Sequence, residues 1–157
     1  RQKHFPTAIE PLYMLAPKAQ MIHTVSGGYE VEWEDVNDNV ILPVLRSAAQ
    51  ELAGYFSGTV QQFSVPCMPV GTPFQQRVWQ ALTHISYGTV CTYSDIANAV
   101  GNPAGVRAVG GAIGKNPLGI IVPCHRVIGK DGSLTGFAGG LDRKEALLKL
   151  EKKYACV

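Results

Sequence analysis

The sequence predicts an α+β fold, with a small N-terminal domain of β-sheet and helix followed by a mainly helical C-terminal domain. Residues 1–70 hold short alternating segments typical of strands and then one long helical stripe. Residues 71–157 hold several short helical patterns separated by glycine and proline. The run 65–71 contains two prolines and is typical of an extended linker, which places the domain boundary between residues 70 and 71.

Short strands are expected in the N-terminal domain at 12–16, 21–25 and 29–33. The last of these alternates strictly, so that one face is buried and the other is acidic. From about residue 40 to residue 56 the pattern becomes helical, and Gly58 ends it. The apolar stripe of this helix consists of Leu45, Ala48, Ala49, Leu52 and Tyr55 or Phe56.

Capping signals define the first helices of the C-terminal domain. Thr72 followed by Pro73 is a helix start, and the apolar positions after it mark one amphipathic helix. Thr92 and Asp95 form a capping box that begins a helix at 93–100. After a Gly-Asn-Pro turn, 104–114 forms a second helix, and the pair is a candidate helix-turn-helix.

The predicted helix at 104–114 is rich in small residues, and Arg107 is its only charged residue. The small residues are Gly105, Ala108, Gly110, Gly111 and Ala112. Each interior glycine costs on the order of 1 kcal/mol relative to alanine, so a close approach must compensate. The approach is either to the protein core, as tight packing, or to DNA, where a smooth helix fits a narrow groove.

The segment 120–129 carries the strongest chemical signal. Three β-branched residues predict a buried strand at 120–122 that Pro123 ends, with Cys124 and His125 at its exit. A cysteine beside a base suits a nucleophilic thiolate, and the alternative is a buried core cysteine beside a surface histidine. Adjacent strand residues point to opposite faces, which favours a water-bridged relay over a direct contact.

The C-terminal helix offers a carboxylate to this pair. Asp142 and Glu145 look like its capping box. Its apolar stripe is interrupted by Glu151, and a carboxylate on a buried face needs a partner. That partner is either His125 or an arginine or lysine.

Charge and cysteine usage limit the possible partners. Residues 1–72 hold four Lys/Arg against seven Asp/Glu, net −3, and residues 73–157 hold ten against five, net +5. This asymmetry indicates a polyanion partner for the C-terminal half, or else ordinary surface variation. The four cysteines lack C-x-x-C spacing, so we expect no metal site and reduced thiols inside the cell. No apolar run approaches the ~18 residues of a membrane span, and no membrane partner is expected.

At this point the sequence resembles the O(6)-alkylguanine-DNA alkyltransferase family across 71–151. The matching motifs, in order, are Gly71-Thr72-Pro73-Phe74-Gln75, Tyr93-Ser94-Asp95-Ile96-Ala97, Arg107-Ala108-Val109-Gly110-Gly111, Asn116-Pro117, Pro123-Cys124-His125-Arg126 and Gly139-Gly140. Residues 1–70 resemble the family's N-terminal, ribonuclease H-like domain only in size and in the order of strands and helix. For 71–157 the resemblance implies a DNA-binding and alkyl-transfer domain with a short active-site strand.

The resemblance also implies the roles of individual residues. Cys124 would accept the alkyl group, His125 would take the thiol proton through water, and Glu151 would orient the ring. Tyr93 would assist base flipping and the leaving guanine, and Asn116 would be a hinge. The implied DNA contacts, with Arg107 as the finger that enters the duplex, are Arg107, Tyr93, Thr92, Ala104, Gly110 and Lys115. The implied substrate pocket is Val127, Phe137, Ala138 and Lys144.

The implied activity is direct reversal of DNA damage. A methyl or larger alkyl group would pass from O6 of guanine, and from O4 of thymine, in a flipped-out base of double-stranded DNA to the thiol, once per molecule. No cofactor is expected, the protein is expected to be a monomer, and its compartment is the cytoplasm, or the nucleus in a eukaryote.

One departure and two alternatives accompany the resemblance. Phe137 stands where the family usually carries tyrosine, with Ala138 beside it, so a phenol near Lys144 is missing. A non-catalytic alkyltransferase-like lesion sensor is the alternative function, and it would lack the nucleophile that Cys124 supplies. A cysteine hydrolase is a further alternative, which the adjacent spacing of Cys124 and His125 disfavours.

Overall fold

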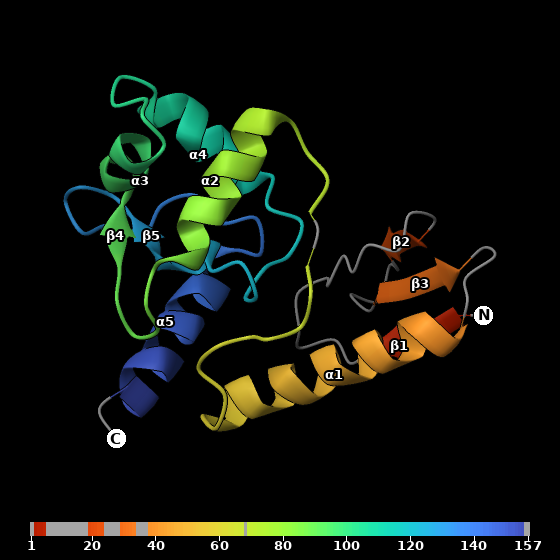
Figure 1. Ribbon diagram of the computed structural model, residues 1–157. Helices are drawn as coiled ribbons and strands as arrows, with labels where there is room; N and C mark the ends of the chain where they lie inside the picture. Colours follow the sequence, from red (N-terminus) through yellow and green to blue (C-terminus); the bar gives the residue numbers. More distant parts are fainter. Residues whose placement is uncertain (1, 6–18, 24–28, 34–37, 68, 156–157) are drawn as a thin grey trace. The chain divides into compact units, whose positions relative to one another are not determined.

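The computed structural model describes residues 2–5, 19–23, 29–33, 38–67 and 69–155, with side chains from Pro43 onward. The fold is α+β, as the sequence predicts. The chain divides into two compact units, Arg1–Val70 and Gly71–Val157 (Figure 1). Each unit is described separately below.

The first unit contains an antiparallel sheet and one helix. Its strands are β1 (Gln2–Phe5), β2 (Ala19–His23) and β3 (Tyr29–Trp33), and β3 lies between the other two. The strand predicted at 29–33 is confirmed, and the one at 21–25 overlaps β2. The segment 12–16 lies outside the described residues, and β1 was not predicted.

Helix α1 (Asp38–Ser57) follows the sheet strands in sequence. Its buried residues repeat with helical spacing, which confirms most of the predicted stripe: Leu45, Ala48, Leu52 and Tyr55. Ala49 is exposed, so its place in the stripe was wrong. The buried stripe of the helix is narrower than the predicted one, so Ala49 lies on the polar face and is exposed to solvent.

The second unit packs four helices around a two-stranded parallel sheet. Its elements are α2 (Pro73–Thr83), β4 (Cys91–Thr92), α3 (Tyr93–Ala99), α4 (Val106–Gly114), the single 3-10 turn η1 (Cys124–Arg126), β5 (Val127–Ile128) and α5 (Leu141–Ala155). Helices α2, α3 and α4 pack on one another, and α5 packs on η1 (Figure 1). Cys91 pairs with Val127 and Thr92 with Ile128 in the parallel sheet.

The predicted helix starts are confirmed by their hydrogen bonds. Thr72 and Gln75 form a reciprocal capping box at α2, with Pro73 in the first turn. Thr92 and Asp95 form a second box at α3. The second helix of the pair begins at Val106, so Ala104 belongs to the turn before α4.

Trp79 joins α2 to α4 inside this unit. Its indole is 2% exposed, and its Nε1–H donates to the carbonyl of Ala112 at 2.8 Å. Val78, Leu82 and Val109 are completely buried in the same core. The position of α4 is therefore set by a directional bond as well as by apolar packing.

The predicted strand at 120–122 was wrong. The chain turns there: the amide of Val122 donates to the carbonyl of Leu118, and Ile120 has φ 71°. Cys124 then begins η1, and the short strand at the site, β5, comes after the Cys-His pair. The β-branched residues reflect burial, because Ile120 and Val122 are 2% and 4% exposed.

The predicted capping box at the last helix was also wrong. Helix α5 begins at Leu141, so Asp142 lies inside its first turn. Glu145 instead forms an exposed ion pair with Lys149, with 2.7 Å between Nζ and Oε1. Gly140, with φ 96°, supplies the chain reversal that comes before the helix.

Within the described parts of the chain, no helix has the length and apolar character needed to cross a membrane. The same residues contain no group of three or more potential metal ligands.

Candidate active site

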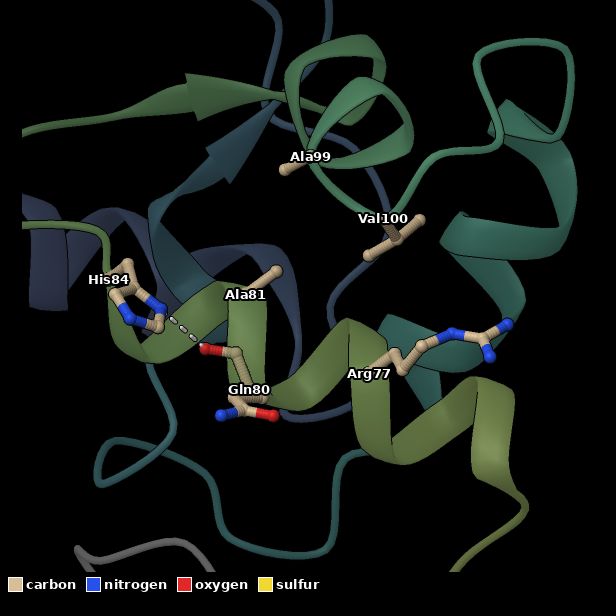
Figure 2. Close-up of a pocket in the computed structure, with 6 residues that line it drawn as sticks. All are labelled: Arg77, Gln80, Ala81, His84, Ala99 and Val100. Atoms are coloured by element: carbon tan, nitrogen blue, oxygen red, sulfur yellow. Dashed lines mark hydrogen bonds between the residues drawn. The ribbon is translucent and has the colours of Figure 1, made fainter.

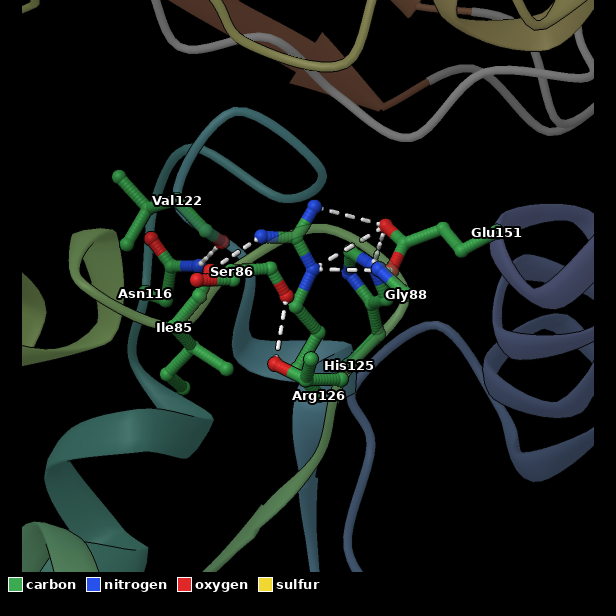
Figure 3. A network of polar contacts seen from close by, with 9 residues as sticks. Ile85, Ser86, Gly88, Asn116, Val122, His125, Arg126 and Glu151 are labelled. Carbon is green, nitrogen blue, oxygen red and sulfur yellow. Dashed lines mark hydrogen bonds and ion pairs between the residues drawn. The ribbon is translucent and has the colours of Figure 1, made fainter. Parts of the chain in front are cut away.

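A buried carboxylate, Glu151 of α5, is the centre of a polar network (Figure 3). His125 Nε2 lies 2.7 Å from its Oε1. Arg126 donates to the same carboxylate from Nε, at 2.9 Å to Oε2, and from Nη2, at 2.8 Å to Oε1. His125 and Glu151 are completely buried, and Arg126 is 6% exposed. Both candidate partners of Glu151, the histidine and an arginine, are therefore present.

The electrostatics of this network favour an ionised carboxylate and a neutral imidazole. Burial by itself would raise the pKa of Glu151, but the hydrogen bonds and charges of His125 and Arg126 lower it to about 2. Burial lowers the pKa of His125 below its ordinary value, and the charges of Arg126 and Lys144 add to this effect, while Glu151 opposes it. A proton taken up by the neutral imidazole of His125 would therefore be held only transiently.

The loop after α2 closes over the network. The amide of Gly88 donates to Glu151 Oε2 at 3.2 Å, and Arg126 Nη1 donates to the carbonyl of Ile85 at 2.6 Å. The guanidinium also lies over the ring of Tyr87, 5.6 Å from its centroid. The loop after α2 and the turn η1 therefore together hold the carboxylate of α5.

Cys124 directly precedes the network, as the first residue of η1. Its side chain is mostly covered, with 8% exposed. Because the two neighbours lie on a 3-10 turn instead of a strand, they do not alternate between sheet faces, as the sequence-based interpretation had assumed. A negative charge on Cys124 would raise the pKa of Lys144 of α5, so the two side chains interact electrostatically.

Lys144 and Tyr93 hold the segment that follows β5. Lys144, which is completely buried, donates from Nζ to the carbonyl of Val127 and, at 2.9 Å, to that of Thr135. Tyr93 donates from its hydroxyl to the same Thr135 carbonyl at 2.8 Å. Burial lowers the pKa of Lys144, opposed by Cys124. The structure thus brings together three predicted residues, Tyr93, Val127 and Lys144.

The predicted pocket residues Phe137 and Ala138 lie on this same segment, half-buried and exposed respectively. Gly136, just before them, has φ 57°, and a Cβ there would lie 3.3 Å from the hydroxyl of Tyr93. The segment is therefore closely fitted to Tyr93 at Gly136.

Asn116 connects the end of α4 to the turn before Cys124. Its Nδ2 donates to the carbonyl of Val122 at 2.8 Å (Figure 3). Its Oδ1 accepts from the amide of Leu118 at 3.0 Å. Both groups of the amide side chain are used to shape the turn. The hinge role that the resemblance implies for Asn116 stays a prediction.

The outer face of α4 is smooth and carries one charge. Arg107, Ala108, Gly111 and Gly114 are exposed, and the buried residues of the helix are Val109, Ala112 and Ile113. A Cβ added at Gly111 or Gly114 would meet nothing within 4 Å, whereas one at Gly110 would make ordinary contact with the ring of Tyr93, at 3.9 Å. Tight internal packing therefore does not account for Gly111. Lys115, also exposed, is the C-cap.

A cavity of about 380 Å³ lies away from these residues, against α2 and the end of α3 (Figure 2). It is lined by Arg77, Gln80, Ala81, His84, Ala99 and Val100. None of them is a predicted site residue, and the His84 ring is engaged by the carbonyl of Gln80 at 2.9 Å.

The sequence left an arginine or lysine open as a partner of Glu151 without identifying it. Arg126, directly after the Cys-His pair, is that residue, and the acidic position within an apolar stripe was the signal for a cation. Gly88 donates through its backbone, which no residue pattern reveals. Thr135 is likewise used only through its carbonyl.

Comparison with known proteins gives consistent matches for the second unit. Residues 73–153 match the family profile described as 6-O-methylguanine DNA methyltransferase, DNA binding domain. The methylated-DNA–protein-cysteine methyltransferase of Haemophilus influenzae is 54% identical over 112 residues, 71% of this chain and 63% of the relative. The protein of the same name from Methanosarcina barkeri is 55% identical over 107 residues, 68% of each chain. The chain thus matches about two thirds of the length of these curated relatives.

Solved structures extend the likeness to the fold. Mycobacterium tuberculosis OGT in complex with DNA has a TM-score of 0.68 at 52% identity, covering 69% of this chain and 68% of that one. Mycobacterium tuberculosis O6-methylguanine methyltransferase has a TM-score of 0.69 at 39% identity, covering 87% of this chain and 93% of that one.

Proposed function

Because this chain belongs to the 6-O-methylguanine DNA methyltransferase family, we propose that it repairs alkylated double-stranded DNA by moving the alkyl group onto Cys124. The group comes from O6 of guanine, and from O4 of thymine, and the transfer is irreversible. The observation that carries the proposal is the placement of Cys124 beside a buried His125–Glu151 pair.

The chemistry needs a thiolate, because a free thiol with a pKa of ~8.5 is mostly protonated at neutral pH. Nε2 of His125 is engaged with Glu151, so Nδ1 is the nitrogen that accepts the thiol proton, through water. The sulfur then attacks the alkyl carbon, a C–S bond forms and the C–O bond breaks. Its electron pair stays with the base, which takes up a proton as it leaves.

Tyr93 serves the leaving base, and Lys144 lines its pocket. Tyr93 supplies a proton or a hydrogen bond to the base. To do so, its hydroxyl gives up its hydrogen bond to the Thr135 carbonyl and donates to the base instead. Phe137 gives the pocket an aromatic wall without a second phenol. The thioether has no good leaving group, so each molecule reacts once and needs no cofactor.

DNA binding is assigned to the helix-turn-helix of α3 and α4. The smooth face of α4 enters the minor groove, where small residues allow a close approach. Arg107 enters the duplex in place of the flipped nucleotide. Thr92, Ala104, Gly110 and Lys115 are the further contacts. The similarity to Mycobacterium tuberculosis OGT, which was solved in complex with DNA, supports DNA binding by this chain.

We assign the two units different tasks. Residues 71–157 bind DNA and transfer the alkyl group, and residues 1–70 form the ribonuclease H-like N-terminal domain. The protein acts as a monomer, in the cytoplasm, or in the nucleus if its source is a eukaryote.

Intact-mass spectrometry after incubation with a duplex containing O6-methylguanine tests the proposal. We expect a gain of one methyl group per molecule, located on Cys124, and no gain in Cys124→Ser, which still binds the duplex. Binding of the lesion without any mass gain would favour the lesion sensor. Repeated turnover of an ester or of the DNA would contradict single-use transfer.

A further inference from the structure

We propose that Arg126 is a positioning residue, which holds His125 in the one neutral form able to accept the proton of Cys124. It acts through Glu151, by keeping that side chain an anion. The proposal rests on the alkyl transfer proposed above and adds a residue to it.

The geometry of the carboxylate defines the tautomer of the histidine. An ionised carboxylate only accepts hydrogen bonds, so His125 must donate to Glu151 Oε1 from Nε2, across 2.7 Å. The lone pair is then on Nδ1, the nitrogen that must act as the base. A protonated Glu151 could donate to Nε2 instead, and the ring proton would move to Nδ1. The ring would then be a donor toward the thiol, and the base would be lost.

Arg126 supplies the permanent charge that prevents this. Its Nε and Nη2 reach both oxygens of Glu151, at 2.9 and 2.8 Å, in a forked arrangement that suits a carboxylate. Its own position is fixed by the bond from Nη1 to the carbonyl of Ile85 and by the ring of Tyr87. A guanidinium does not lose its proton in proteins, so this support is independent of pH.

The other charged or titratable groups around the pair cannot replace Arg126. From α5, Lys144 acts on His125 but donates to the carbonyls of Val127 and Thr135. From the loop after α2, Tyr87 is neutral at physiological pH, since burial raises its pKa. Among the residues that the structure describes, Arg126 is the permanent cation that contacts Glu151.

Nitrogen NMR of the DNA-free protein gives the most direct test. In the wild type, the spectrum of labelled His125 should show a protonated Nε2 and an unprotonated Nδ1. In Arg126→Gln the population should shift toward protonated Nδ1, and Arg126→Lys should restore the wild-type form in large part. Lys149→Gln, on the exposed side of α5, is the matched charge control and should leave the spectrum unchanged. A wild-type His125 protonated on Nδ1 would overturn the proposal even if Arg126→Gln failed to fold.

Single-turnover kinetics give the second readout. Arg126→Gln should lower the alkyl-transfer rate at neutral pH by roughly 10²-fold, the low end of what a general base contributes. The pH at which the rate begins to rise should also be higher in this variant than in the wild type, while its DNA affinity stays the same. A variant with lower thermal stability but an unchanged pH profile and tautomer would show that Arg126 is merely structural. Failure of the wild type to take up the alkyl group would refute the proposed function, and the NMR result would stand separately.

Discussion

Glu151 has four hydrogen-bond donors from two segments of the second unit: two on Arg126 and one on His125, both in η1, and the amide of Gly88 in the loop after α2. A buried charge network of this kind adds little stability compared with an apolar core, but removal of one member leaves the others uncompensated. The network therefore specifies the geometry of the site more than it stabilises the fold.

Replacement of Glu151 by alanine should be strongly destabilising. It leaves the buried Arg126 and His125 without their acceptor, and breaking such a pair costs about 3–5 kcal/mol. The free energy of unfolding, measured by urea denaturation, should fall by this amount. Lys149→Ala, which breaks the exposed pair with Glu145, should change it by less than about 1 kcal/mol. Equal losses for the two variants would contradict the assigned roles.

Stability should also depend on acid in a defined way. The folded pKa of Glu151 is about 2, below its ordinary value of 4.5, so its contribution is complete above pH 4.5 and is lost as the pH falls toward 2. His125 has a lowered folded pKa, so the unfolded chain binds its proton first, and stability is lost as the pH falls below 6.5. Denaturation across this range should show both losses. Glu151→Gln should remove the dependence at the acid end, and an unchanged curve would contradict the assignment.

Sequence reasoning reached part of this network. Glu151 could be identified because an acidic residue interrupts an apolar stripe, and the pattern left His125 and a basic residue open as its partners. The buried bonds of Lys144 could not be read from the sequence, because its acceptors are backbone carbonyls. Side chains that bind the backbone of distant segments leave no signature in residue spacing.

At the level of elements, the two capping boxes offer a matched pair. Thr72→Ala and Thr92→Ala each remove one reciprocal cap and should each cost about 1 kcal/mol of stability. We expect only Thr92→Ala to weaken DNA binding as well, because Thr92 begins the first helix of the proposed binding pair. Denaturation and titration with a fluorescent duplex measure the two effects. Equal DNA affinity in the two variants would remove Thr92 from the interface.

Helix α4 allows stability and binding to be separated. Gly111→Ala adds a Cβ in open space and replaces an interior helix glycine with a better helix former. The free energy of unfolding should therefore rise by about 1 kcal/mol. If α4 enters a groove of DNA, the same change should weaken binding, and Gly111→Leu should weaken it further. Ala49→Leu, at an exposed position of α1, is the control and should leave affinity unchanged. Undiminished affinity in Gly111→Leu would contradict the placement of α4 against DNA.

Local signals predicted the helices well and the strands less well. Capping boxes involve residues three apart, so both could be identified from the sequence. Strands β4 and β5 have two residues each, and their paired residues are 36 positions apart in the sequence, which no local pattern reveals. The turn at Ile120 was mistaken for a strand because its β-branched residues are buried without being extended.

At the scale of the whole molecule, charge separates the two units. Residues 1–70 hold four Lys/Arg against seven Asp/Glu, and residues 71–157 hold ten against five. DNA affinity should therefore fall as salt rises, with the logarithm of the binding constant linear in the logarithm of the salt concentration. Lys115→Gln should reduce the slope by about 1, the value for one phosphate contact. An affinity independent of salt would contradict a DNA-binding face.

The α+β class itself followed from the change of hydrophobic period along the chain.

The bond between the Trp79 indole and the Ala112 carbonyl also makes Trp79 an intrinsic fluorescence probe of α4. Indole emission is sensitive to hydrogen bonding and solvent, and this ring touches the helix proposed to meet DNA. The chain has a second tryptophan, Trp33 in β3, which Trp33→Phe would remove from the signal. Titration of that variant with duplex should leave the emission maximum in place if α4 docks as a rigid body. A shift to longer wavelength would report that the helix separates from its support.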